Sequence, residues 1–286
     1  MKALWAIPGS LMESYRILHE FRPHVVVGVG GYSSGPPVLL AALMRIPTLL
    51  QEQNARPGIT NRLLSRFAGR IAVAFEESRV YLGSRTVLTG NPVRDGFLQG
   101  RSQKSRDRFT LLIFGGSQGS HPINQAMVEA LDLLKPCSGI LRFIHQTGEK
   151  DLEWVRRAYQ TAGVEGDVRP FFDDMPLQFS RSDLIICRSG AMTLAELTVA
   201  GKAALLVPFP LAADNHQQRN AEAMANAGAA EMILQSELSG RRLAERIAFF
   251  HEHQDELRQM EDRSREMGRP DAVEQIVRLL EELIHV

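Results

Sequence analysis

Short apolar runs alternate along the chain with longer segments in which apolar residues recur at helical spacing. The first group of runs occupies residues 24–30, 47–53, 70–75 and 86–90. The second group occupies residues 109–116, 141–148, 167–172, 183–190 and 203–210. Runs of this length, bounded by glycine or proline and separated by helical segments, are typical of parallel strands joined by helices. The pattern therefore predicts two doubly wound α/β domains of the Rossmann type.

The two groups of strands are separated by a stretch of different composition. Residues 90–108 are rich in glycine, polar and basic residues, which is typical of an interdomain connection. A chain of 286 residues also exceeds the usual size of a single core. We expect a first domain at residues 1–95, a linker at 96–108, a second domain at 109–265, and a C-terminal helix at 266–286 that returns to the first domain.

The first domain opens on an amphipathic helix rather than on a strand. Leu11, Tyr15, Leu18 and Phe21 lie near helical spacing in this segment. In doubly wound sheets the first strand-to-helix turn usually carries the phosphate-binding glycines. Since four strands are predicted here against five in the second domain, we expect the first domain to be incomplete and to lack an N-terminal βα portion.

Composition and charge narrow the class of protein. Lys and Arg number 33, as do Asp and Glu, so no overall positive field attracts nucleic acid and any phosphate contact must be local. No apolar run approaches the ~20 residues of a membrane-spanning helix. Cys137 and Cys187 lie far apart in sequence, which favours buried thiols in a reducing cytoplasm. Because no carboxylate and histidine cluster has metal-site spacing, we expect no bound metal.

Two of the apolar runs end in similar glycine-rich loops. Residues 25–37 read VVVGVGGYSSGPP, and residues 111–120 read LLIFGGSQGS. Glycine after a strand lets the backbone approach a ligand, and the free N–H groups of the following helix favour an anion. A tight turn without a ligand explains one such loop equally well. A second loop in a second domain favours a pair of phosphate-binding loops.

Two further strand ends carry polar residues suited to a nucleotide sugar. In CRSGAMTLAE, residues 187–196, Glu196 lies near the start of a helix, where a carboxylate can bind the paired hydroxyls of a ribose. Taken alone, a role in balancing the helix dipole explains Glu196 better. The run ending at residue 210 is followed by a polar cluster of Asp214, Asn215, His216, Gln217 and Gln218. This cluster suits sugar hydroxyls, although Asp214 as a helix N-cap with solvated neighbours is the alternative.

A nicotinamide-dependent oxidoreductase is a competing interpretation. Gly28, Gly30 and Ser33 approximate the dinucleotide fingerprint, and Glu52 falls roughly twenty residues further on. The third position of the fingerprint is serine rather than glycine or alanine, so the match is weak. This interpretation also leaves the second glycine loop and the Gln217 cluster unexplained.

Eight ordered motifs carry a resemblance to a known family. They are GVGGYSSGP, QEQN, GNPVR, FGGSQGS, HQTG, FFDDM, CRSGAMTLAE and PFPLAADNHQQRNA. In this order they resemble the undecaprenyl-diphospho-muramoylpentapeptide β-N-acetylglucosaminyltransferases of bacterial cell-wall synthesis, from about residue 8 to the end of the chain. The resemblance implies two Rossmann-like domains facing each other across a cleft, the GT-B arrangement.

The resemblance also implies an activity and a set of binding residues. The family transfers N-acetylglucosamine from UDP-N-acetylglucosamine to the C4 hydroxyl of a muramoyl-pentapeptide lipid diphosphate, by inversion and without a cofactor. The residues implied for the donor are Asn54, Arg94, Ser117, Phe172, Ala191, Met192, Thr193, Leu194, Ala195, Glu196, Gln217 and Gln218. The residues implied for the acceptor diphosphate are Gly30, Gly31, Tyr32 and Ser33.

The chain departs from the family at the catalytic base. The family has a further glycine-rich loop, about 70 residues upstream of anything present here, that supplies the proposed histidine base. His24 precedes a strand and His145 belongs to the HQTG strand end, so neither occupies the matching position. The catalytic residues are therefore unassigned, the activity of this chain is open, and a noncatalytic UDP-sugar-binding remnant is the alternative.

The lipid acceptor implies contact with a membrane. The resemblance places the chain peripherally on the cytoplasmic face of the bacterial cell membrane, where it would serve cell-wall biogenesis, cell shape and cell division. The interfacial candidates in the first helix are Leu4, Trp5, Ile7, Leu11 and Met12, with Arg16 nearby. An ordinary helix that packs on the core explains these residues equally well.

Overall fold

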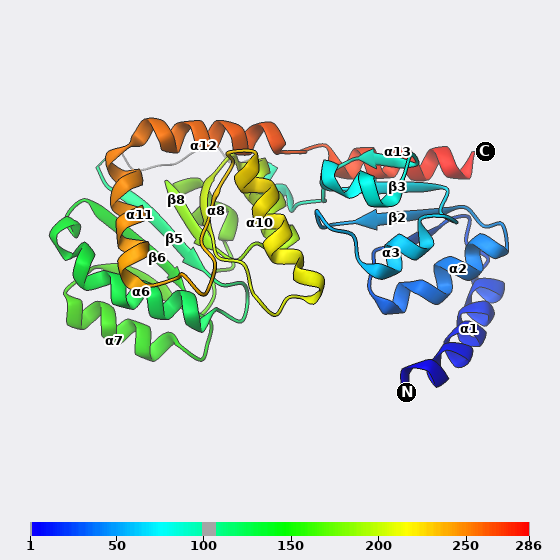
Figure 1. Ribbon diagram of the computed structural model, residues 1–286, viewed down its shortest axis with the longest axis horizontal. Coiled ribbons are helices and arrows are strands. Elements are labelled where there is room, and N and C mark those ends of the chain that lie inside the picture. The colour runs from blue at the N-terminus through cyan, green and yellow to red at the C-terminus, as the bar shows by residue number, and fades with distance from the viewer. Residues whose placement is uncertain (1, 99–106, 286) are drawn as a thin grey trace. The chain divides into compact units, whose positions relative to one another are not determined.

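The computed structural model describes residues 2–98 and 107–285, with the backbone alone described for residues 2–8. It divides into two compact units, Met1–Pro92 with Arg269–Val286, and Val93–Gly268. We call them unit 1 and unit 2. Most of the expected linker at 96–108 falls on residues 99–106, outside the described residues. The expected parallel α/β architecture is confirmed in both units (Figure 1).

Unit 1 contains a four-stranded parallel sheet in the order β1-β2-β3-β4. Its strands are β1 (Val26–Gly28), β2 (Thr48–Glu52), β3 (Arg70–Val73) and β4 (Thr86–Leu88). Its helices are α1 (Lys2–Phe21), α2 (Gly35–Leu43), α3 (Ile59–Leu64), α4 (Arg79–Leu82) and α13 (Ala272–Ile284), with short 3₁₀ turns at Tyr32–Ser34 and Glu76–Ser78. All four strands lie within the first group of apolar runs.

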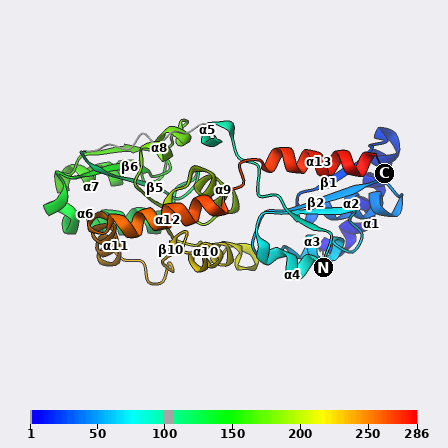
Figure 2. The ribbon, with the colours of Figure 1, turned by 90° about the horizontal axis from the view of Figure 1, so that it is seen from above.

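The sheet of unit 1 is covered on both faces, and successive residues of β2, which point to opposite sides, pack on different helices. Leu50 packs with Val38 of α2 on one face, whereas Leu49 packs with Leu279 of α13 on the other. Helix α13 contacts β2 and β3 and runs alongside the strands (Figure 2). The end of the chain is therefore an integral layer of unit 1.

Unit 2 contains a six-stranded parallel sheet in the order β10-β9-β8-β5-β6-β7. Its strands are β5 (Phe109–Phe114), β6 (Leu141–Gln146), β7 (Gly166–Arg169), β8 (Leu184–Cys187), β9 (Ala203–Leu206) and β10 (Glu231–Met232). Its helices are α5 (Asp95–Leu98), α6 (His121–Leu134), α7 (Leu152–Ala162), α8 (Met175–Arg181), α9 (Ala191–Ala200), α10 (His216–Asn226), α11 (Gly240–Glu252) and α12 (Gln254–Met267), with 3₁₀ turns at Lys135–Cys137 and Ala213–Asn215. Strand β10 was not predicted, because two partly buried residues give no pattern.

Strand β5 is the centre of unit 2, and all six of its residues are buried. Leu111 and Ile113 join a core with residues of α6, α7 and α11, whereas Phe114 meets Phe179 of α8 on the other face. The chain leaves β5 toward β6 and β7 and then returns to pair β8 with the opposite edge of β5. In an open α/β sheet, this reversal places the ligand beyond the carboxyl ends of the strands flanking it.

Candidate active site

The loop after β5 has the form of an anion-binding turn. The N–H of Gly119 donates to the carbonyl of Gly116 at 3.1 Å and closes a turn that leaves Ser117 exposed. Gly119 has φ of 75°, and a Cβ there would lie 1.9 Å from the carbonyl oxygen of Thr147. Only glycine fits this position. Helix α6 starts directly after the turn, so its first N–H groups are available to an anion.

The residue before α6 adds a second polar group to this turn. Ser120 is the N-cap of α6, and its hydroxyl makes no capping bond. The Ser120 Oγ atom is buried without a hydrogen-bond partner. Buried hydroxyls without a partner are uncommon in folded proteins, which distinguishes this turn from an ordinary helix start.

The loop after β8 leads into a second helix start at α9. Gly190 is the N-cap of α9 and offers no side chain, so the first N–H groups of the helix are uncapped. The side chain of Met192 is 48% exposed, whereas Leu194 is 1% exposed and packs into the core. Ala191, Thr193 and Ala195 are half-buried. Of the residues 191–196 predicted for the donor, Leu194 can therefore contribute no side-chain contact.

Glu196 and Arg94, which are 102 positions apart, lie together in the structure. Their Oε1 and Nη2 atoms are 3.2 Å apart, with the Glu196 side chain 15% exposed and that of Arg94 61% exposed. The pair forms because α5 packs on α8 and α9, with the ring of Phe97 edge-on to that of Phe179. Burial raises the pKa of Glu196 above its usual value, and Arg94 opposes this shift.

The polar loop between β9 and α10 is tied to the loop after β8. Ser189 Oγ donates to the carbonyl of Gln217 at 2.7 Å. The Gln217 Oε1 atom accepts from the N–H of Phe209 at 3.0 Å, whereas Gln218 bonds along its own helix to Glu222. Gln217 therefore lies in the first turn of α10 with its side chain directed back to the loop, whereas the side chain of Gln218 bonds along the helix.

The interpretation of Asp214 as a helix N-cap is wrong. The N-cap of α10 is Asn215, whose side chain makes no capping bond. Asp214 and Asn215 both adopt left-handed backbone conformations, with φ of 50° and 56°. Two consecutive non-glycine residues in this region are strained, and such strain is concentrated at functional sites.

Phe172 follows β7, and its ring is buried in the core. The ring is 2% exposed, and the guanidinium of Arg169 lies 4.9 Å from its centre. The N–H of Phe172 donates to Oε1 of Gln146 at 2.9 Å. Gln146, whose own role was not predicted, is a buried amide at the end of β6. A buried polar side chain at a strand end was the signal available in the sequence.

The first glycine loop lies after β1 in unit 1. Tyr32 is 87% exposed and begins a 3₁₀ turn that leads through Ser33 into α2, with Gly30 and Gly31 immediately before it. Gly28 has a different role, because a Cβ there would lie 2.7 Å from the Val38 side chain. It allows α2 to pack closely on β1.

Glu52 organises the loop after β2 and is not available to a ribose. The carboxylate is 2% exposed. It accepts from the backbone and side-chain nitrogens of Asn54 at 3.0 and 3.2 Å, from the N–H of Gly58 at 3.2 Å, and from Nδ2 of Asn61 at 2.8 Å. The nicotinamide interpretation, which required Glu52 to face a cofactor, is therefore wrong. Glu52 instead holds Asn54 in place.

The two histidines considered as bases lie away from these loops. His145 is fully buried, with Nε2 3.1 Å from Asn124 Oδ1 and Nδ1 3.3 Å from the Tyr159 hydroxyl. Burial lowers the pKa of His145 to about 3, so the ring is neutral. His24 precedes β1, at the end of that strand opposite to the glycine loop.

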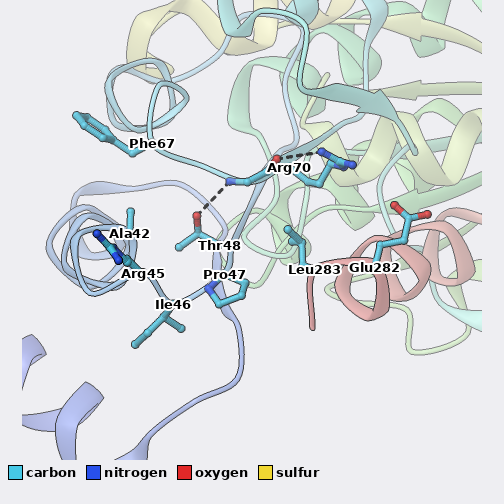
Figure 3. Close-up of a pocket in the computed structure, with 10 residues that line it drawn as sticks. Ala42, Arg45, Ile46, Pro47, Thr48, Phe67, Arg70, Glu282 and Leu283 are labelled. Atoms are coloured by element: carbon cyan, nitrogen blue, oxygen red, sulfur yellow. Dashed lines mark hydrogen bonds between the residues drawn. The ribbon is translucent and has the colours of Figure 1, made fainter. Parts of the chain in front are cut away.

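A hollow of about 400 Å³ lies at the other end of the unit 1 sheet (Figure 3). Arg45, Thr48, Phe67, Arg70 and Leu283 are among the residues that line it. The Thr48 hydroxyl accepts from the N–H of Gly69 at 3.3 Å. Because the hollow opens at the amino ends of β2 and β3, it lies opposite the ligand-binding end of such a sheet.

Within residues 2–98 and 107–285, the structure groups no three His, Cys, Asp or Glu side chains that could hold a metal ion. No helix in the same ranges is long and apolar enough to cross a membrane.

Comparisons with known proteins match the chain along most of its length. Residues 110–276 match the Glycosyltransferase family 28 C-terminal domain, and residues 1–73 match the Glycosyltransferase family 28 N-terminal domain. A Myxococcus xanthus protein named UDP-N-acetylglucosamine--N-acetylmuramyl-(pentapeptide) pyrophosphoryl-undecaprenol N-acetylglucosamine transferase is 48% identical over 281 residues, covering 96% of this chain and 73% of that protein. A Syntrophus aciditrophicus protein of the same name is 45% identical over 278 residues, covering 96% of this chain and 77% of that protein.

A solved structure also matches the chain along most of its length. The crystal structure of Acinetobacter baumannii MurG matches with a TM-score of 0.85 and 34% identity, covering 97% of this chain and 80% of that one.

Proposed function

The chain belongs to glycosyltransferase family 28, and from this premise we propose that it transfers N-acetylglucosamine from UDP-N-acetylglucosamine to the C4 hydroxyl of a muramoyl-pentapeptide lipid diphosphate in peptidoglycan synthesis. The carrying observation is the 48% identity to a transferase of that name over 96% of the chain. The arrangement of unit 2 supports it, because two uncapped helix starts and a half-buried carboxylate lie at the carboxyl ends of β5 and β8.

The donor binds to unit 2 through groups of complementary chemistry. The diphosphate is held by Ser117 and by the N-termini of α6 and α9, where N–H groups favour negative charge. Glu196 accepts from the ribose hydroxyls, with Arg94 beside it at 3.2 Å. The backbone near Phe172 faces the uracil, and Gln217 faces the sugar.

The same groups stabilise the leaving UDP. Negative charge grows on the diphosphate as the bond to the sugar breaks, and fixed dipoles aimed at that charge are often the largest catalytic contribution. The acceptor diphosphate binds at Gly30, Gly31, Tyr32 and Ser33 of unit 1. Asn54, held by Glu52, serves the reaction centre. We assign no base, because His145 is enclosed and His24 precedes its strand.

The binding part of this proposal is tested by calorimetry. UDP-N-acetylglucosamine and UDP are expected to bind, and NAD is not. Binding of NAD in place of UDP would contradict the proposal. Transfer of radiolabelled N-acetylglucosamine to the lipid acceptor then tests activity. Donor binding without transfer under conditions in which the Myxococcus xanthus relative is active would favour a noncatalytic UDP-sugar-binding protein.

Contact with the cytoplasmic membrane surface completes the proposal, since the acceptor is a lipid. Apolar side chains of α1 and α2 support it: Met12 is 72% exposed, Phe21 78% and Leu43 66%. Helix α1 buries Leu18 yet exposes Met12 and Phe21, so packing on the core does not account for the whole apolar surface of α1. The side chains of Leu4, Trp5 and Ile7 lie outside the described residues.

The membrane contact is tested by sedimentation with lipid vesicles. Binding to vesicles rich in anionic lipid is expected to weaken severalfold when Met12 and Phe21 are replaced by glutamate. Replacing Val80, which is 88% exposed on α4, by glutamate in the same way provides the matched control. Equal binding by all three proteins would contradict this part of the proposal.

A further inference from the structure

Gln146 is the last residue of β6, and its side chain lies between the loops that follow the two neighbouring strands. Its Nε2 atom donates to the carbonyl oxygen of Gly116 at 3.0 Å. Its Oε1 atom accepts from the N–H of Phe172 at 2.9 Å. The residue is 1% exposed, so it acts on a ligand only through the loops that it joins.

These two loops belong to strands that are not adjacent. The order β5-β6-β7 places β6 between them, so Gly116 and Phe172 share no strand ladder. Backbone contacts tie the loops only in neighbouring pairs: Gly119 packs on the Thr147 carbonyl, and the N–H of Gly148 donates to the carbonyl of Pro170 at 3.1 Å. The side chain of Gln146 reaches both outer loops at once.

The chemistry of the two partners requires an amide. The Gly116 carbonyl only accepts and the Phe172 N–H only donates, so the side chain must offer a donor at one atom and an acceptor at the other. An ionised glutamate would set oxygen against oxygen at Gly116. Methionine would leave both buried backbone groups unpaired.

The contact at Gly116 reaches the residue proposed to hold the phosphate. The same carbonyl accepts from the N–H of Gly119 and closes the turn that carries Ser117. Movement of this carbonyl would therefore move the turn. Phe172 opens the loop proposed to face the uracil, so Gln146 connects the base-binding and phosphate-binding parts of unit 2.

We propose that Gln146 is a positioning residue that fixes the spacing between the phosphate-binding turn and the uracil-binding loop. The inference rests on the proposed function, in which Ser117 contacts the diphosphate and the backbone near Phe172 faces the uracil. UDP spans both contacts, whereas uridine uses only the second. Preorganised spacing favours the ligand that must satisfy both contacts together.

The test compares UDP with uridine in two variants of the full chain, Gln146→Glu and Gln146→Met. The ratio of the two affinities, measured by calorimetry, does not depend on the fraction of protein that is folded. The matched control is Gln178→Met, which removes an amide that is 4% exposed and bonds locally to Asp174 at 2.9 Å. Donor KM and kcat for the transfer reaction, with thermal unfolding, complete the measurements.

The UDP-to-uridine affinity ratio is expected to fall about tenfold in both Gln146 variants and to stay within about twofold in Gln178→Met. Donor KM should rise by a similar factor, while kcat at saturating donor changes less than about threefold. A lowered melting temperature with an unchanged ratio in the Gln146 variants would show a structural role only and overturn the inference. Wild-type protein that bound no UDP would overturn the proposed function and this inference with it.

Discussion

Replacing Glu196 by alanine removes the one carboxylate proposed to bind the donor ribose. A hydrogen bond to a charged group contributes about 1.5–3 kcal/mol, so the Kd for UDP should rise about 10- to 150-fold. Arg94 loses its partner, but its side chain is 61% exposed and water replaces the contact. The loss of affinity therefore reports the ligand bonds themselves. Isothermal titration with UDP and with UDP-N-acetylglucosamine measures it.

The same carboxylate is expected to lower the stability of the free protein at neutral pH. Burial raises the pKa of Glu196, with Arg94 acting in the opposite direction. Because the pKa of Glu196 is higher in the folded state than in the unfolded state, its contribution to stability is fully present below the unfolded pKa. That contribution is lost as the pH rises through the folded pKa. Glu196→Gln, which removes the charge and keeps the shape, should therefore weaken UDP binding without lowering the melting temperature.

The control is Glu165→Gln, at a carboxylate that is 86% exposed and paired with Arg108. It should change neither the UDP affinity nor the stability by more than about 0.5 kcal/mol. A UDP dissociation constant within twofold of wild type in Glu196→Ala would refute the ribose role. A clear fall in melting temperature in Glu196→Gln at neutral pH would refute the electrostatic reasoning.

Three further predictions concern the packing behind the site. Because burial lowers the pKa of His145 to about 3, its contribution to stability is lost as the pH falls below the unfolded value of about 6.5. Between pH 7 and 5 this loss of unfolding free energy should reach about 2 kcal/mol in the wild-type protein. In denaturant titration over the same pH range, His145→Gln should lose about 2 kcal/mol less than the wild-type protein. Gly119→Ala should lower the free energy of unfolding by about 2 kcal/mol or more and abolish UDP binding in calorimetry. Gly139 has open space around it, so Gly139→Ala should change neither the stability nor the binding. Leu279→Ala should lower the stability measured by thermal unfolding by about 3 kcal/mol. Val277 is 45% exposed, so Val277→Ala should lower it by less than about 1 kcal/mol. Equal effects of the two substitutions would contradict the packing of α13.

The strands were predictable because parallel strands covered on both faces are mostly apolar. Five of the six buried residues of β5 are apolar, with Thr110 the exception, and glycine marks the end of the run. Strand β10 has only two residues, both partly buried, and leaves no such trace. Local composition therefore identifies the central strands and loses the short edge strand.

The polar groups were less predictable because their roles depend on distant partners. Glu196 is suggested by its place in a helix, yet its pairing with Arg94 arises from the packing of α5 on α9. Glu52 lies at a plausible ribose-binding spacing, and only its four hydrogen bonds assign it to its own loop. Gln146 is meaningful only once β5 and β7 are known to flank β6.

The position of α13 determines the order in which the two units can finish folding during translation. Unit 2 occupies a continuous stretch of the chain, whereas unit 1 takes its strands from residues before Pro92 and one covering helix from residues after Arg269. Domains usually fold as units while the ribosome is still adding residues. The sheet face that carries Leu49 and Ala72 is covered only once Leu279 has been translated, so the strands of unit 1 precede unit 2 in the chain but complete their packing after it. A nascent chain stalled near residue 268 would present that face to chaperones.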